Sequence, residues 1–288
     1  MLKMGFNEGC TWDGNRGCAD QSLMADLKAC AKYGFKGIDI RFDCLDKYLA
    51  EGGTLEELNA FMKANDIALC FFNMKQTAEE KQAVMDELDD IIKKCAALDC
   101  HMVVVVPSCD LNEKGIEATR QEIRDDAVAV LKEMVKKCEP TGLKLSLEFC
   151  GAPSMSINTF DDAYEIVKLV DSPLMGVTLD QYHFNGSDWS KLEKADGDKI
   201  FVWHLNDTED VPAGAGYNTD AKRLWPSDPR GCLDHKRFAD TLKEIGYDFE
   251  NGFITMEVFR PDYYEMTTDE NIKTAAAETA KHIQRYCK

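Results

Sequence analysis

The sequence predicts a (β/α)8 barrel, the α/β fold of TIM-barrel enzymes. Three observations predict it. Apolar runs of strand length recur between longer amphipathic stretches, eight such runs can be counted, and no Gly-rich phosphate-binding turn follows the first. A doubly wound open sheet is the alternative. Eight units without that turn favour closure into a barrel.

The expected strands are runs of five or six residues. Several lack polar alternation, notably Val103 to Val106, which is typical of parallel strands covered on both faces. In chain order the expected strands are residues 3–7, 37–41, 67–72, 102–106, 144–149, 175–180, 200–205 and 253–258.

The stretches between these runs predict helices. Gly34, Gly142 and Gly246 follow three of them, and Thr54 and Thr159 precede two others as N-caps. The expected helices are residues 21–33, 55–64, 78–98, 118–138, 160–170, 236–245 and 269–286, with a short sixth helix at 190–195.

No domain linker stands out, so we expect one domain over residues 1–288. The one long irregular stretch, residues 207–233, is rich in Pro and Gly. Long loops inside compact domains are usually functional, and we expect this one to form part of an active-site wall or a lid.

The amino-acid composition limits the classes of partner that the protein is expected to bind. With 52 acidic against 34 basic residues the formal net charge is −18, which repels nucleic-acid phosphates and anionic lipid surfaces. There is no apolar run of transmembrane length and no signal-peptide pattern, and we expect a cytoplasmic protein. The twelve cysteines include no Cys-x-x-Cys pair, which indicates buried thiols rather than a zinc or disulfide framework.

The ends of the last four expected strands carry residues that bind metals. In such barrels the chemistry lies at the carboxyl ends of the strands. Any one such residue is more often an ion-pair partner, a cap or a core histidine, but four at consecutive strand ends converge, and three converging carboxylates repel one another without a cation. Three oxygen ligands and one imidazole suit Mn²⁺, Co²⁺, Mg²⁺ or Zn²⁺. The predicted ligands are Glu148, Asp180, His204 and Glu257.

Several longer motifs also resemble a known family. They are GFNE at 5–8, GIDIR at 37–41, LEF at 147–149, NTFDDAYEIV at 158–167, LDQYHF at 179–184, HLNDTED at 204–210, RLWP at 223–226 and EVFRPDYY at 257–264. With them the chain resembles, over nearly its whole length, the sugar isomerase/epimerase superfamily with a xylose isomerase-like TIM barrel. Within it the chain is most similar to the inosose isomerases, or 2-keto-myo-inositol isomerases, of myo-inositol catabolism.

The resemblance places the family's metal ligands on the same four residues and implies one divalent ion, with Mn²⁺ expected and Co²⁺, Zn²⁺ or Mg²⁺ as alternatives. It also implies that His183 and Arg223 bind substrate hydroxyls. Two polar residues at the ends of the first two strands, Asn7 and Arg41, are further candidates to line the pocket. Residues 226–231 depart from the family's Pro-Gly-x-Gly turn, so the substrate can differ.

The reaction that the resemblance implies is the shift of a carbonyl between adjacent carbons of a cyclic polyol ketone through a cis-enediol. Glu148 and Glu257 are the expected catalytic acid/base residues. A ketose 3-epimerase, a metal-dependent lyase that cleaves C-glycosides of 3-keto sugars, and a non-catalytic sugar-binding barrel remain alternatives. Five histidines and the acidic charge argue against an apurinic endonuclease. The expected partner is a small polyol or sugar, and a homo-oligomer is left open.

Overall fold

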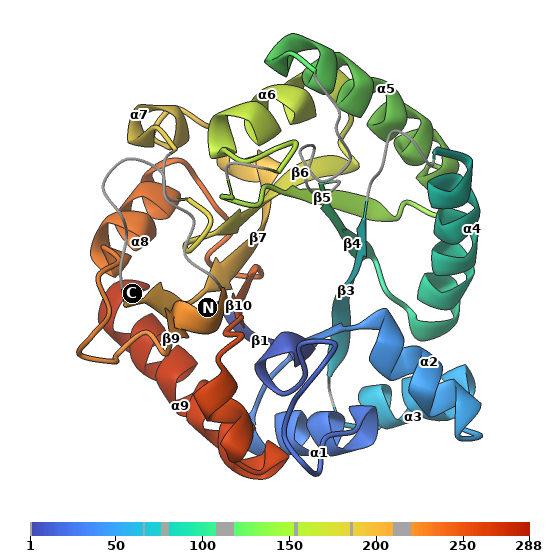
Figure 1. Ribbon diagram of the computed structural model, residues 1–288, viewed down its shortest axis with the longest axis vertical. Coiled ribbons are helices and arrows are strands. Elements are labelled where there is room, and N and C mark those ends of the chain that lie inside the picture. Colours follow the sequence, from blue (N-terminus) through green and yellow to red (C-terminus); the bar gives the residue numbers. More distant parts are fainter. Residues whose placement is uncertain are drawn as a thin grey trace.

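Eight parallel strands close into a barrel, and the helices form a ring around it (Figure 1). The computed structural model describes residues 2–65, 67–75, 81–107, 118–152, 155–184, 187–209 and 220–288. Around the barrel the strands follow the order β1, β10, β7, β6, β5, β4, β3, β2. The predicted fold class is therefore confirmed.

The barrel strands coincide closely with the predicted runs. They are β1 (Lys3–Asn7), β2 (Gly37–Ile40), β3 (Ala68–Lys75), β4 (Met102–Val106), β5 (Lys144–Glu148), β6 (Met175–Asp180), β7 (Ile200–Leu205) and β10 (Phe253–Met256). Their register brings strand ends together, since Asp180 pairs with His204 and Glu148 with Thr178. Functional side chains at these ends consequently lie at one rim.

The outer helices follow the predicted alternation. Thr54 and Thr159 cap α3 and α6 by accepting a hydrogen bond from a backbone N–H three residues on, and Gly34 ends α1 with φ at +85°. The helices are α1 (Leu23–Tyr33), α2 (Phe42–Ala50), α3 (Leu55–Ala64), α4 (Lys81–Leu98), α5 (Arg120–Cys138), α6 (Phe160–Val170), α7 (Trp189–Leu192), α8 (His235–Glu244) and α9 (Thr268–Tyr286).

Two features differ from the sequence prediction. Helix α2 was not expected, and Arg41, predicted to end the second strand, is instead the extended N-cap residue of this helix. The stretch 207–233, expected to be irregular, contains the 3-10 turn η3 (Asp220–Lys222) and two short antiparallel strands, β8 (Asp207–Thr208) and β9 (Arg223–Leu224). Residues 210–219 of this stretch lie outside the described residues. The expectation that the stretch forms a lid falls on these residues and stays a prediction.

The main hydrophobic core lies between the strands and the helices. Phe160 of α6 is fully buried against Phe149, Tyr164 and Phe184. Most of the described cysteines are buried free thiols, as the sequence predicted. No helix among the described residues is long and apolar enough to cross a membrane.

Candidate metal centre and active site

Four side chains from consecutive strands of the C-terminal half meet at the rim of the barrel. Glu148 ends β5, Asp180 ends β6, His204 lies on β7 and Glu257 directly follows β10. Each offers one ligand atom, and these atoms all lie within 4.8 Å of one another. All four residues are buried, with at most 5% of their surface exposed. The structure thus brings together the four residues that the sequence proposed as ligands.

The chemistry of this donor set fits a divalent ion. His204 Nδ1 lies 3.1 Å from Glu148 Oε1, 3.1 Å from Glu257 Oε2 and 3.9 Å from Asp180 Oδ2. One imidazole nitrogen and three carboxylates therefore face a common point. Hard oxygen donors with one histidine are typical of Mn²⁺, Mg²⁺, Co²⁺ and Zn²⁺ sites, and four protein ligands leave coordination positions for substrate.

Burial and charge act against each other at these ligands. Burial opposes ionisation of Asp180, but the Arg223 guanidinium keeps the pKa of that carboxyl well below its usual range. Burial likewise opposes protonation of His204, but the carboxylates of Glu257 and Glu148 raise its pKa well above its usual value. The carboxylates thus stabilise a positive charge at the point that they face, which is where a bound cation would lie.

Arg223, a predicted substrate contact, is a buried cation beside the ligands. Its Nη1 donates to Asp180 Oδ2 at 2.7 Å and to Glu257 Oε2 at 3.2 Å, and its Nε donates to Asp220 Oδ1 at 3.0 Å. The guanidinium carbon lies 4.4 Å from the Tyr182 ring centroid. Carboxylates and an aromatic face thus hold the guanidinium at the pocket wall.

His183, the second predicted substrate contact, is next to Arg223. The Nε2 atom of His183 lies 3.1 Å from Arg223 Nη2, and the Gly151 N–H donates to His183 Nδ1 at 3.2 Å. An alanine at Gly151 would place its Cβ 2.7 Å from the His183 carbonyl oxygen, so this close approach requires glycine. The imidazole is thereby fixed with its other nitrogen toward Arg223.

Two asparagines hold two of the four carboxylates. Asn7 Nδ2 donates to Glu257 Oε1 at 2.9 Å, and Asn206 Nδ2 donates to Asp180 Oδ1 at 2.9 Å. Both asparagines are at most 1% exposed. Asn7 was expected to line the pocket; the structure places it beneath Glu257 and not among the described lining residues.

A pocket of about 650 Å³ opens above the cluster. Its lining includes Glu148, His183, Arg223 and Glu257 from the C-terminal half, and Arg41 with its neighbours Phe42 and Asp43 from the N-terminal half. Arg41 therefore lies at the pocket, with its guanidinium paired to Asp43 through Nε at 3.0 Å.

Sequence reasoning missed the residues that support this site. They are Asp220, which lines the pocket and binds Arg223, and Asp39 and Asn206, which belong to the carboxylate hydrogen-bond networks. Asn206 had a sequence signal, because it follows His204 by two residues and so points to the same face at the end of the strand.

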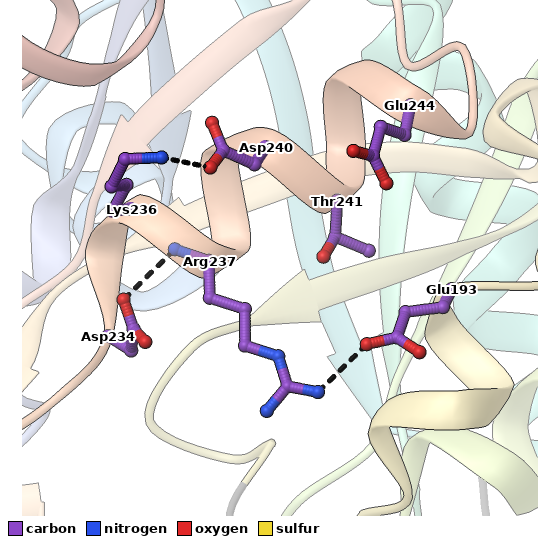
Figure 2. A pocket seen from close by; sticks show the side chains of 7 residues that line it. All are labelled: Glu193, Asp234, Lys236, Arg237, Asp240, Thr241 and Glu244. Carbon is purple, nitrogen blue, oxygen red and sulfur yellow. Dashed lines mark hydrogen bonds and ion pairs between the residues drawn. The ribbon is translucent and has the colours of Figure 1, made fainter.

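A second depression, of about 370 Å³, lies on the outer wall of the barrel between α7 and α8 (Figure 2). It shares no described lining residue with the pocket above the ligands. Of its described lining side chains, Arg237 pairs with Glu193 and Lys236 with Asp240. Both basic groups are thus already neutralised, and the depression offers no unpaired cation to an anionic ligand.

Comparison with known proteins agrees with this geometry. The family model described as xylose isomerase-like TIM barrel matches residues 27–286. Inosose isomerases of Halalkalibacterium halodurans and Bacillus velezensis are 37% and 35% identical, each alignment covering 99% of this chain and 98% of the relative. A crystal structure of the IOLI protein with a binding zinc atom superposes with a TM-score of 0.89, at 34% identity and 99% coverage of both chains.

These matches extend over almost the whole chain and are close enough to establish its family. The relatives that match from end to end are isomerases, so the chain is an enzyme of the isomerase class. The chain belongs to the xylose isomerase-like TIM barrel family.

Proposed function

We propose that this protein is a divalent-metal-dependent isomerase that shifts a carbonyl between adjacent carbons of a cyclic polyol ketone of the 2-keto-myo-inositol type. The observation that carries the proposal is the buried convergence of Glu148, Asp180, His204 and Glu257 beneath the pocket. The full-length similarity to inosose isomerases supports the choice of substrate class.

The proposed metal ligands are these four residues, with Mn²⁺ as the proposed ion. Zinc is the ion in the IOLI crystal structure and the first alternative to test. When bound, a divalent ion would polarise a substrate carbonyl and the hydroxyl on the adjacent carbon. It would thereby make the C–H of that adjacent carbon more acidic.

The two glutamates are the proposed acid/base groups. Glu148 Oε1 faces His204 Nδ1, so we assign Oε2 of Glu148 to the substrate C–H proton. Glu257 enters the pocket from the neighbouring side of the cluster and is assigned the proton exchange at the adjacent carbon or oxygen. Protonation of the former carbonyl carbon, together with transfer of the hydroxyl proton to the former carbonyl oxygen, completes the carbonyl shift.

The pocket suits an uncharged, hydroxylated ring. The arginines among its described lining residues, Arg41 and Arg223, are both paired with carboxylates. They retain N–H donors for hydroxyl groups but little net positive charge for a phosphate. His183, beside Arg223, adds a polar ring at the same wall.

The test is to incubate the Mn²⁺-loaded protein with 2-keto-myo-inositol in D₂O and to follow the proton NMR spectrum, with an EDTA-treated sample alongside. We expect an isomeric inosose with deuterium at the shifted carbon, and loss of both signals with chelator. Parallel samples loaded with Zn²⁺, Co²⁺ and Mg²⁺ identify the ion that supports the fastest turnover.

The matched control is Arg237→Ala in the outer depression of Figure 2, which removes a surface ion pair and should leave conversion unchanged. If metal-loaded protein converts no inosose, the substrate assignment is wrong. The same assay then moves to ketohexoses, which test 3-epimerisation, and to 3-keto-glycosides, which test lyase activity.

A further inference from the structure

We propose that Asn7 is a positioning residue for the catalytic glutamate Glu257, held in place by Asp39 and by the backbone of Gly9. This inference rests on the proposed acid/base role of Glu257. It assigns Asn7 to the support of the carboxylate and not to contact with substrate.

Both N–H groups of the Asn7 side-chain amide are used, and its oxygen accepts a bond from the backbone. Its two N–H groups serve Glu257 Oε1, at 2.9 Å, and Asp39 Oδ2, and its Oδ1 accepts the Gly9 N–H at 2.7 Å. These partners also fix the orientation of the amide, since only its nitrogen can face two carboxylates. A substrate hydroxyl could accept a hydrogen bond from Asn7 only by displacing Glu257 or Asp39.

The register of the barrel strands brings Asn7, Asp39 and Glu257 together. Asn7 ends β1, pairs with Asp39 of β2 on one side, and lies on the other side beside β10, which leads directly into Glu257. Both Asn7 and Asp39 are at most 1% exposed. A hydrogen bond in such a buried place is well shielded from water and restricts the Glu257 side chain more than a surface bond would.

Gly9 completes the support. A Cβ at Gly9 would lie 2.1 Å from the Phe259 ring and 2.8 Å from Asn7 Oδ1. Any larger residue would therefore push on the amide or on Phe259, which lines the pocket and lies 5.3 Å from the Arg223 guanidinium carbon. The glycine lets the backbone N–H approach closely enough to hold Asn7.

Asn206 supplies a matched comparison. It is also a buried strand-end asparagine, but its amide donates to Asp180, which is assigned only to metal binding. Removing either side-chain amide should abolish a hydrogen bond to the carboxylate of a candidate metal ligand, and the two bonds should be of similar strength. The two losses should differ in what they change, because one carboxylate moves protons and the other does not.

The experiment compares Asn7→Leu with Asn206→Leu by steady-state kinetics at saturating Mn²⁺ and by calorimetric titration of Mn²⁺. We expect Asn7→Leu to lower kcat about 10- to 100-fold with KM changed less than about threefold. Asn206→Leu should chiefly weaken Mn²⁺ binding, with kcat largely restored by excess ion. If excess Mn²⁺ restores Asn7→Leu, or if KM rises while kcat holds, the proposal is wrong.

Two further measurements cover failure to fold and failure of the substrate assignment. Asp39→Asn keeps the volume but replaces the charged acceptor of the Asn7 N–H with a neutral amide oxygen, so it should give a smaller loss of kcat in the same direction. A crystal structure of Mn²⁺-loaded Asn7→Leu needs no substrate. A displaced or disordered Glu257 side chain supports the proposal, and an unchanged one overturns it even if another ketone proves to be the substrate.

Discussion

Arg223 Nη1 lies 2.7 Å from Asp180 Oδ2, so a permanent buried cation is bonded directly to one of the four candidate metal ligands. The same nitrogen reaches Glu257 Oε2 at 3.2 Å. Arg223 therefore neutralises part of the charge that a divalent ion would also neutralise. Stability and metal binding should consequently be linked through this one side chain.

Replacing Arg223 with Met should destabilise the metal-free protein by about 3–5 kcal/mol, because buried carboxylates would lose their counter-charge. With saturating Mn²⁺ the loss should be smaller, since the ion then supplies positive charge. Urea unfolding in EDTA and in Mn²⁺ measures both values, with Arg237→Met as the surface control. Equal losses under the two conditions would contradict the link.

Replacing Glu257 with Gln should reduce kcat more than about 100-fold while weakening Mn²⁺ binding much less, because the amide keeps a ligand oxygen but cannot exchange a proton. Turnover at saturating ion and calorimetric titration of the ion separate the two effects. Asp180→Asn should show the reverse pattern. Parallel losses of kcat and ion affinity in Glu257→Gln would make Glu257 a ligand alone.

A buried carboxyl pair at the start of the chain should make a contribution to stability that falls as pH rises. Burial raises the pKa of Asp26 to about 7, and burial together with the charge of Asp26 raises the pKa of Glu8 well above its usual value. An unfolded Asp titrates near about 3.9. The contribution of Asp26 is therefore complete below about pH 4 and declines until about pH 7, by about 1.4 kcal/mol per pH unit.

Replacing Asp26 with Asn should remove this contribution, so that the slope of the free energy of unfolding against pH becomes more positive by up to about 1.4 kcal/mol per pH unit. The free energy of unfolding, measured in urea with EDTA at intervals between pH 4.5 and 8, gives the slope for each protein. The two bonds that Asp26 accepts, from Thr11 Oγ1 at 3.0 Å and Gln21 Nε2 at 2.8 Å, suggest some general loss of stability as well. Identical slopes in variant and wild type would refute the assignment.

Acid should destabilise the fold through His282. This ring is 3% exposed, its nitrogens have no hydrogen-bond partner among the described residues, and it packs against His235, Trp203 and Tyr286. Burial, with the nearby His235, lowers its pKa to about 3. The folded pKa lies below the unfolded value of about 6.5, so stability is present above pH 6.5 and is lost as pH falls toward 3.

Replacing His282 with Phe, which keeps a ring among these neighbours, should therefore reduce the slope of stability against pH below pH 6.5. Urea unfolding in EDTA, followed by tryptophan fluorescence and far-UV circular dichroism, measures the slope. An acid sensitivity equal to that of the wild type would assign the effect to other groups.

Much of this molecule follows from sequence pattern because parallel strands impose simple rules. Apolar runs gave the strands, and the end of each run gave the position at the catalytic rim. Glu148, Asp180, His204 and Glu257 were thus accessible without coordinates. Helix α2 was not, since it starts directly after β2 and its N-cap, Arg41, makes no side-chain capping bond that a sequence motif would reveal.

The supporting contacts were also inaccessible, for a different reason. The bond from Asn7 to Glu257 joins residues 250 positions apart, and the pairing of Asn7 with Asp39 depends on the register of β1 and β2. Strands β8 and β9 have two residues each, too few to show any periodicity. Such details are set by closure of the barrel, which no local pattern describes.

The four candidate ligands lie at the carboxyl ends of β5, β6, β7 and β10, whereas Arg41 and Phe42, which also line the pocket, lie beyond the end of β2. Under the proposed function the reacting groups therefore come from the C-terminal half, and the N-terminal half contributes to the lining of the pocket. Mutations in the N-terminal half can reshape the bound molecule's surroundings while the reactive half stays intact, provided that Asn7 is kept. Directed evolution toward a new ketone should accordingly begin at the wall formed by residues 41–43.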